Sequence, residues 1–211
     1  MRLEWSRRFT SLTSLMGSRL SVPTAAPRVL LGRLLPTSGL YALDPVHTFV
    51  SFRVQHLVVG QVVGRFDETH GTITLTDDPQ LASLDVTVVT KGVSTHNAMR
   101  DEDLRSARFF NVAEYPTMTY RSAKVIAELE GWTVDGSLTV RDVTRPVPLY
   151  AQITGPVEED GGRVRFGIHA QANASRKDFG LLTDLERESG GLILRNDIVI
   201  TIDAEALLQG H

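Results

Sequence analysis

Side chains able to hold the polar end of a ligand are concentrated in the segment Ser94–Tyr120. Arg100 presents a planar fork of donors that suits a phosphate or a carbonyl oxygen, and Asp101 follows it directly. Thr95 and His96 lie about one helical turn before Arg100, so a helix here would bring them to the same face. A connection that is long, charged and aromatic is more often a binding site than a simple turn between strands.

Each of these residues also has a structural interpretation. Arg100 and Asp101 could form a salt bridge that fixes the connection, with Asp101 holding backbone amides. Thr95 could cap a helix, and His96 could be an exposed loop residue. The sequence leaves ligand contact and structural support open for all four residues.

Two other places could contact a ligand head. His56 ends a strand-like run and could hydrogen-bond a ligand at one end of a barrel, or it could hold a turn backbone. In the loop 175–180, Arg176 could attract an anionic head and Phe179 could plug the mouth of a barrel. The alternative for this loop is a solvated turn ended by Gly180.

The elements that position these residues are strands. From Tyr41 onward, about eight or nine β-rich runs alternate apolar with polar residues and are separated by Gly/Asp turns. This spacing predicts an all-β antiparallel sandwich or barrel, between which alternation alone does not decide. Gly136 predicts a bulge or bend, and short helices are expected at 98–106, capped by Asn97 or Thr95, and near 183–188. The predicted strands are 48–55, 71–76, 84–90, 117–122, 124–129, 132–140, 146–153, 163–174 and 198–204.

Residues 1–38 are expected to form a basic extension that precedes a folded domain at 39–211. Residues 1–40 contain six arginines and a single acid. A stripe of apolar residues predicts an amphipathic helix that touches a membrane surface, and the alternative is a flexible extension or a start codon placed too far upstream. Arginines and hydroxyls interrupt the apolar run that a secretory signal needs, so the sequence favours the cytoplasm over the periplasm. The stripe consists of Trp5, Phe9, Leu12, Met16 and Leu20, and prolines at 23, 27 and 36 predict irregular extended chain after it.

Composition argues against several classes of function. The chain has no cysteine, and its six histidines are dispersed without metal-ligand spacing, so no metal site is expected. The folded part is net acidic, which argues against nucleic-acid binding. No nucleophile elbow, zinc-protease motif or glycine-rich phosphate loop is present. We expect a binding protein rather than an enzyme, while a hydrolase or other enzyme acting on a small apolar substrate, or a stress-response interaction module without a ligand, remain alternatives.

Four motifs, in this order and spacing, resemble those of the YceI-like family of lipid-binding proteins. The resemblance covers about residues 39–208 and implies a lipocalin-like eight-stranded antiparallel barrel with short helices in its connections. It also implies binding of a long isoprenoid, of the quinone or prenyl-phosphate type, for carriage, storage or sequestration, with no further cofactor. Where the family often has a histidine, this chain has Asp103, and an acid there disfavours a phosphate nearby. Exposed edge strands leave a homodimer open. The motifs are Tyr41–His56 with Val63–Phe66, Ser94–Pro116, Gly136–Leu149 and Ser175–Gly180.

The resemblance implies an apolar tunnel, because an isoprenoid chain binds mainly by leaving water, at roughly 25 cal/mol per Å² of apolar surface. Such a site needs only a few polar groups at one end. Taken singly, each candidate for the tunnel wall is also explained as ordinary core packing. The candidates are Phe52, Val54, Phe66, Phe110, Met118, Tyr120 and Leu138.

Overall fold

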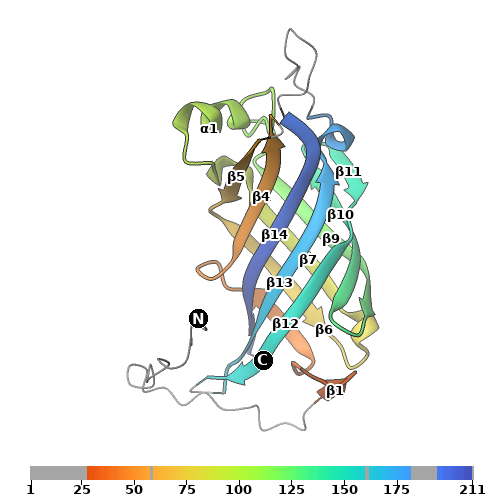
Figure 1. Cartoon of the computed structure of the whole chain (residues 1–211). Helices are drawn as coiled ribbons and strands as arrows, with labels where there is room; N and C mark the ends of the chain where they lie inside the picture. Colours follow the sequence, from red (N-terminus) through yellow and green to blue (C-terminus); the bar gives the residue numbers. More distant parts are fainter. Residues whose placement is uncertain (1–27, 58, 160–161, 182–193, 211) are drawn as a thin grey trace, which may run out of the picture.

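The described residues form a tall β-barrel with one α-helix beside its upper end (Figure 1). The computed structural model describes residues 28–57, 59–159, 162–181 and 194–210, so the predicted helix near 183–188 and the apolar stripe of the first twenty residues lie outside the described part. Among the described helices, none has the length and apolar character needed to cross a bilayer. The strands are β1 (Arg28–Leu30), β2 (Arg33–Leu35), β3 (Gly39–Leu43), β4 (Phe49–His56), β5 (Gly60–Phe66), β6 (Thr69–Leu75), β7 (Ser83–Val89), β8 (Val93–Ser94), β9 (Thr117–Ala127), β10 (Trp132–Val140), β11 (Val143–Pro146), β12 (Leu149–Glu158), β13 (Val164–Ser175) and β14 (Leu194–Leu208).

Eight strands close into a ring in the order β13, β12, β10, β9, β7, β6, β3 and β14, and β14 pairs again with β13. Every neighbouring pair in the ring is antiparallel. The closure between β13 and β14 is a continuous ladder from Arg165↔Leu207 to Ser175↔Asp197. The lipocalin-like eight-stranded antiparallel barrel is therefore confirmed, and the sandwich alternative is removed.

The long strand β14 runs between the two ends of the barrel and pairs with different strands along its length. Its last residues pair with β3, and its earlier part pairs with β4, which continues through β5 to β8. The end of the barrel that carries helix α1 (Ala98–Arg105) is called the upper end here, and the end that carries β1 is the lower end (Figure 1). Strand β5 is absent from the strands that the sequence predicts, because Gly60 and Gly64 are residues typical of a turn.

Glycine at position 136 makes room for an aromatic side chain at a bulge. The ladder between β9 and β10 shifts register between Asp135 and Gly136, as the sequence predicted. A Cβ on Gly136 would lie 2.3 Å from the Tyr120 hydroxyl oxygen, so only glycine fits. The Tyr120 hydroxyl donates to the Val134 carbonyl at 3.0 Å, which holds the ring inside the barrel.

A short hairpin, formed by β1 and β2, lies at the lower end of the barrel, where the sequence predicted irregular chain (Figure 1). Its two-residue turn has positive φ at Leu31 and Gly32. Arg28 donates to the carbonyls of Thr76 and Asp77 on the barrel, and Arg33 donates to those of Gly131 and Glu128. The Arg33 guanidinium also lies 5.4 Å from the centre of the Trp132 ring. The hairpin is thus fastened to the barrel by two arginines, and a domain boundary near residue 38 stays a prediction.

Candidate functional site

The barrel surrounds an apolar cavity of about 210 Å³. The surface that faces it is wholly apolar, and it extends from the middle of the barrel to the upper end, where Leu104, Phe110 and Phe179 contribute to it. All the residues that the sequence proposed for a tunnel wall line this cavity, so the structure brings them together although it does not test their role. They are Phe52, Val54, Phe66, Phe110, Met118, Tyr120 and Leu138.

Three phenylalanines from separate segments form one aromatic group on the cavity wall. The ring centres of Phe52 and Phe66 are 5.7 Å apart, and those of Phe66 and Phe110 are 5.6 Å apart. A Cβ on Gly64 would lie 2.3 Å from the Phe52 ring, so glycine on β5 creates the space that the ring occupies. The connection after α1 therefore contributes to the wall through Phe110.

The short 3-10 helix η3 (Arg176–Phe179) closes one side of the upper end. Arg176 and Phe179 both line the cavity and are only 5% and 4% exposed, which excludes a fully solvated turn for these two residues. Arg176 donates to the carbonyls of Arg195, Leu181 and Leu194 at 3.2, 3.3 and 3.4 Å. Burial lowers the pKa of Arg176. A contact between this arginine and an anionic head stays a prediction.

Thr95, Arg100 and Asp101 form a hydrogen-bonded network with one another. The Asn97 side chain caps α1 by accepting from the Arg100 amide at 3.0 Å, as predicted. The Thr95 hydroxyl and amide both donate to Asp101 Oδ1. Arg100 Nε donates to the Thr95 hydroxyl at 2.7 Å, and Arg100 Nη2 donates to the Thr95 carbonyl at 2.9 Å. The network fixes α1 against the end of β8.

Electrostatics favour the charged form of Asp101 despite its burial. Burial alone would raise its pKa, but the hydrogen bonds from Thr95, with Arg105 and Arg100 nearby, outweigh burial and hold the pKa below its usual value. His96 is exposed and has a positive φ of 58°. In the described part of the chain, none of Thr95, His96, Arg100 and Asp101 is among the residues that line the apolar cavity.

Replacing Asp101 with alanine should destabilise the protein by about 1–3 kcal/mol, because the two Thr95 donors would lose a charged acceptor. Urea unfolding measures this loss. Asp103→Ala is the matched control in the same helix, since Asp103 makes an exposed ion pair with Arg108 and should cost less than about 1 kcal/mol. Equal losses in the two variants would contradict a supporting role for Asp101.

A contact between Arg100 and a ligand head also stays a prediction. If Arg100 donates a buried charged hydrogen bond to the head, Arg100→Ala should weaken binding by about 1–3 kcal/mol.

His56 ends β4 at the upper end and pairs with Gly60 and Leu194. His56 is partly exposed, and within the described residues it does not line the cavity.

A second, smaller apolar hollow of about 80 Å³ lies at the lower end. The β1–β2 hairpin and the residues after it contribute Arg28, Leu35 and Pro36 to its lining. Five barrel residues line both this hollow and the main cavity, so the two spaces are separated by a single layer of side chains. These residues are Ile73, Leu84, Val134, Ala151 and Ile168.

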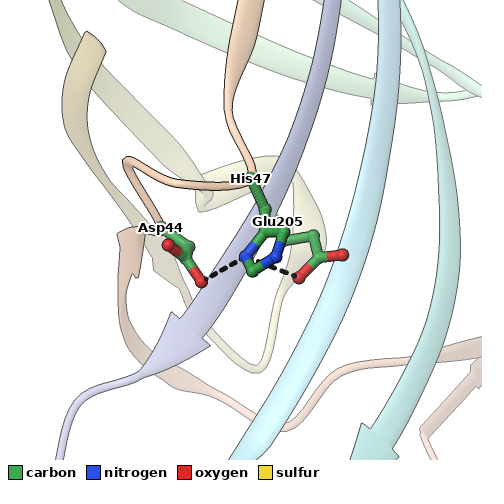
Figure 2. A group of neighbouring side chains, drawn as sticks. All are labelled: Asp44, His47 and Glu205. Carbon is green, nitrogen blue, oxygen red and sulfur yellow. Dashed lines mark hydrogen bonds and ion pairs between the residues drawn. The ribbon is translucent and has the colours of Figure 1, made fainter. Parts of the chain in front are cut away.

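Asp44, His47 and Glu205 form a cluster near the lower end that sequence spacing did not reveal (Figure 2). Their ligand atoms lie within 4.8 Å of one another, and His47 Nδ1 is 2.9 Å from Asp44 Oδ2. Arg165 Nη1, however, lies 2.7 Å from that Asp44 oxygen and 2.5 Å from Glu205 Oε2. The guanidinium occupies the place that a cation would take, so we interpret the cluster as an ion-pair network.

Comparisons with known proteins agree with the geometry. The sequence model of the YceI-like domain matches residues 41–206. Protein YceI of Salmonella newport is 39% identical over 163 residues, which cover 74% of this chain and 85% of that protein. The crystal structure of the Campylobacter jejuni YCEI protein has a TM-score of 0.62 at 26% identity, covering 74% of this chain and 90% of that one. A polyisoprenoid binding domain from Saccharophagus degradans shares the fold, with a TM-score of 0.58 at 17% identity and coverage of 80% and 98%. This chain therefore belongs to the YceI-like domain family.

Proposed function

We propose that this protein binds a long-chain isoprenoid or similar amphiphilic lipid, with the apolar tail inside the barrel, for carriage, storage or sequestration. The observation that carries the proposal is the wholly apolar cavity of about 210 Å³. An engineered apolar cavity of roughly 150 Å³ stays dry and binds benzene, so a larger space of the same character suits part of a lipid tail. The solved polyisoprenoid binding domain with the same fold supports the choice of ligand class.

The groups around the cavity support binding rather than catalysis. Of the polar side chains that line it, Arg176, Tyr120, Thr48 and Ser51 donate to backbone carbonyls. Thr69 carries a buried hydroxyl without a hydrogen-bond partner among the described residues, and so without a base to activate it. A catalytic acid or base must itself reach the reacting atoms of the substrate, and a nucleophile needs a base beside it. A quinone or a prenyl compound would accordingly be cargo, and the protein needs no further cofactor to hold it.

Titration with farnesol tests the proposal. Burying an apolar tail should give saturable binding with a negative heat-capacity change, measured by calorimetry at several temperatures. Farnesol should also raise the melting temperature in a concentration-dependent way, because a ligand that binds only the native state stabilises it. Absence of saturable binding by farnesol, geranylgeraniol and a short-chain ubiquinone would contradict the proposal.

The lower hollow should set the preferred tail length. Ala82 lines this hollow and not the main cavity, so Ala82→Phe should fill it selectively. We expect about a tenfold loss in affinity for geranylgeraniol, equivalent to about 1.4 kcal/mol, with little change for geraniol. Ser83→Phe, at the neighbouring exposed position, is the control. Equal losses for both alcohols would contradict a role in tail length.

A further inference from the structure

The barrel wall has a seam near its upper end. Strand β11 pairs with β10 at Ser137–Val140, whereas β12 pairs with β10 only at Trp132–Val134. β11 ends at Pro146, and Pro148 directly precedes β12; neither proline has an amide to donate to a ladder. On the other side, the ladder between β12 and β13 reaches only Gln171. Within the described residues, 172–175 of β13 therefore pair with β14 alone, and β11 does not close the wall against them.

A cleft of about 440 Å³ lies at this seam, and its surface is part polar and part apolar. Three of its lining residues, Val147, Ala174 and Phe179, also line the apolar cavity. The cleft and the cavity thus meet across a few apolar side chains. A lipid tail in the cavity would have its polar end within reach of this cleft.

The polar side chains of the cleft come from β11, β13, η3 and β14. Asn173, Asp178 and Asp197 are exposed, and Ser175 is half-buried, where they line the cleft. In the described part of the structure, none of these four side chains makes a hydrogen bond or ion pair within the protein. Arg145 donates to the Thr144 carbonyl. These hydrogen-bonding groups contrast with those of Thr95, Arg100 and Asp101, which are used within their own network.

The charge of the cleft restricts the kind of head that fits. The lining contains two carboxylates, Asp178 and Asp197, and one guanidinium, Arg145, so it has an excess of negative charge. A phosphate would meet like charges, which disfavours it. A hydroxyl can donate to a carboxylate and accept from an amide or another hydroxyl, and it loses less hydration than a charged group on leaving water.

We propose that the seam between β11 and β13 holds the head of the bound lipid, and that it selects an uncharged, hydroxyl-bearing head over a phosphate. This inference rests on the proposed function, because it places the head of the lipid whose tail occupies the barrel. It assigns the head to Asn173, Ser175, Asp178 and Asp197 rather than to the α1 network.

Farnesol and farnesyl monophosphate share one tail and differ in the head, so their affinity ratio tests the inference. The unmodified protein should bind farnesol at least about tenfold more tightly. The double variant Asp178→Asn with Asp197→Asn should lower this ratio by about tenfold or more, mainly through tighter binding of the phosphate. Asp142→Asn removes an exposed charge from the adjacent β10–β11 turn and should leave the ratio unchanged. Melting temperatures verify that all variants fold.

An unchanged ratio in the double variant, with both probes bound by the unmodified protein, would overturn the seam assignment and leave the proposed function standing. A loss of binding in Arg100→Ala without any effect of the double variant would place the head at α1 instead, and would also overturn it. If the unmodified protein bound neither probe, the proposed function and this inference would fall together.

Discussion

Replacing Ala170 with phenylalanine should abolish or strongly weaken lipid binding while the barrel stays folded. Ala170 is in the middle of β13, is 3% exposed and lines the cavity. A phenyl ring there would occupy space that the lipid tail needs. Losing about 60 Å² of apolar contact costs about 1.5 kcal/mol at roughly 25 cal/mol per Å², and steric exclusion adds to it. We expect farnesol affinity to fall by about 10–100-fold.

The neighbouring position supplies the control for this substitution. Gln171 is exposed on the opposite face of the same strand, so Gln171→Phe adds the same ring outside the barrel. It should leave binding unchanged. Filling an apolar cavity should not destabilise the fold, since empty volume costs about 24 cal/mol per Å³. A folded Ala170→Phe variant with full farnesol affinity would contradict a tail site inside the barrel.

Of the substitutions considered for their effect on stability, Arg165→Met should lower the free energy of unfolding the most. Arg165 is ion-paired with Asp44, Glu159 and Glu205 at 2.7, 2.6 and 2.5 Å, and its side chain is 18% exposed. These carboxylates come from the β3–β4 turn, from the residue that follows β12 and from β14, so the guanidinium joins three parts of the lower barrel. Without it, the three carboxylates would repel one another. We expect the free energy of unfolding to fall by about 2–4 kcal/mol at neutral pH, measured in urea.

The loss in Arg165→Met should depend on pH in a defined direction. Hydrogen bonds from Arg165 and His47 hold the pKa of Asp44 well below its usual value. A carboxyl with a depressed pKa stabilises the native state above its unfolded pKa of about 3.9, and this contribution is lost as the pH falls. The stability gap between the two proteins should therefore be widest near neutral pH and narrow below about pH 4.

An exposed ion pair on the same barrel provides the comparison. Arg121 pairs with Asp85 while 70% exposed, so Arg121→Met should cost less than about 1 kcal/mol. A stability gap for Arg165→Met that is as small as this, or that stays constant from pH 7 to acid, would contradict the network interpretation. Asp44 also raises the pKa of His47. The charged imidazole therefore stabilises the native state below about pH 6.5, and this contribution to stability is lost as the pH rises.

Local patterns predicted most of the longer strands and the helix because those elements depend on neighbouring residues, whereas the short strands β1, β2, β3 and β8 were not predicted. Alternation marked Trp132–Val140 with the bounds that the structure has, and the polar segment with Asn97 as cap marked α1. Strand β5 was missed because its glycines resemble turn residues, although Gly64 is there to make room for Phe52. The two predicted runs on either side of residue 123 are one strand, β9.

Contacts between distant residues could not be predicted from one sequence. Asp44 and Arg165 are 121 positions apart, and only barrel closure brings them together. The same holds for the seam, where Arg145 and Asp197 line one cleft only because β13 pairs with β14. The family resemblance predicted the closed barrel. No local sequence pattern marks the polar residues of the seam as a binding site. The charged pair Arg100 and Asp101 does form a recognisable pattern, but in the structure both residues hydrogen-bond within their own network.

Mass spectrometry of an organic extract of the purified protein tests the central claim most directly. The unmodified protein should release a prenyl-type or other long-chain amphiphile in an amount close to the amount of protein, and Gln171→Phe should release the same compound. Ala170→Phe should release little or none. An extract without any such lipid, or equal yields from the unmodified protein and Ala170→Phe, would contradict a lipid site inside the barrel.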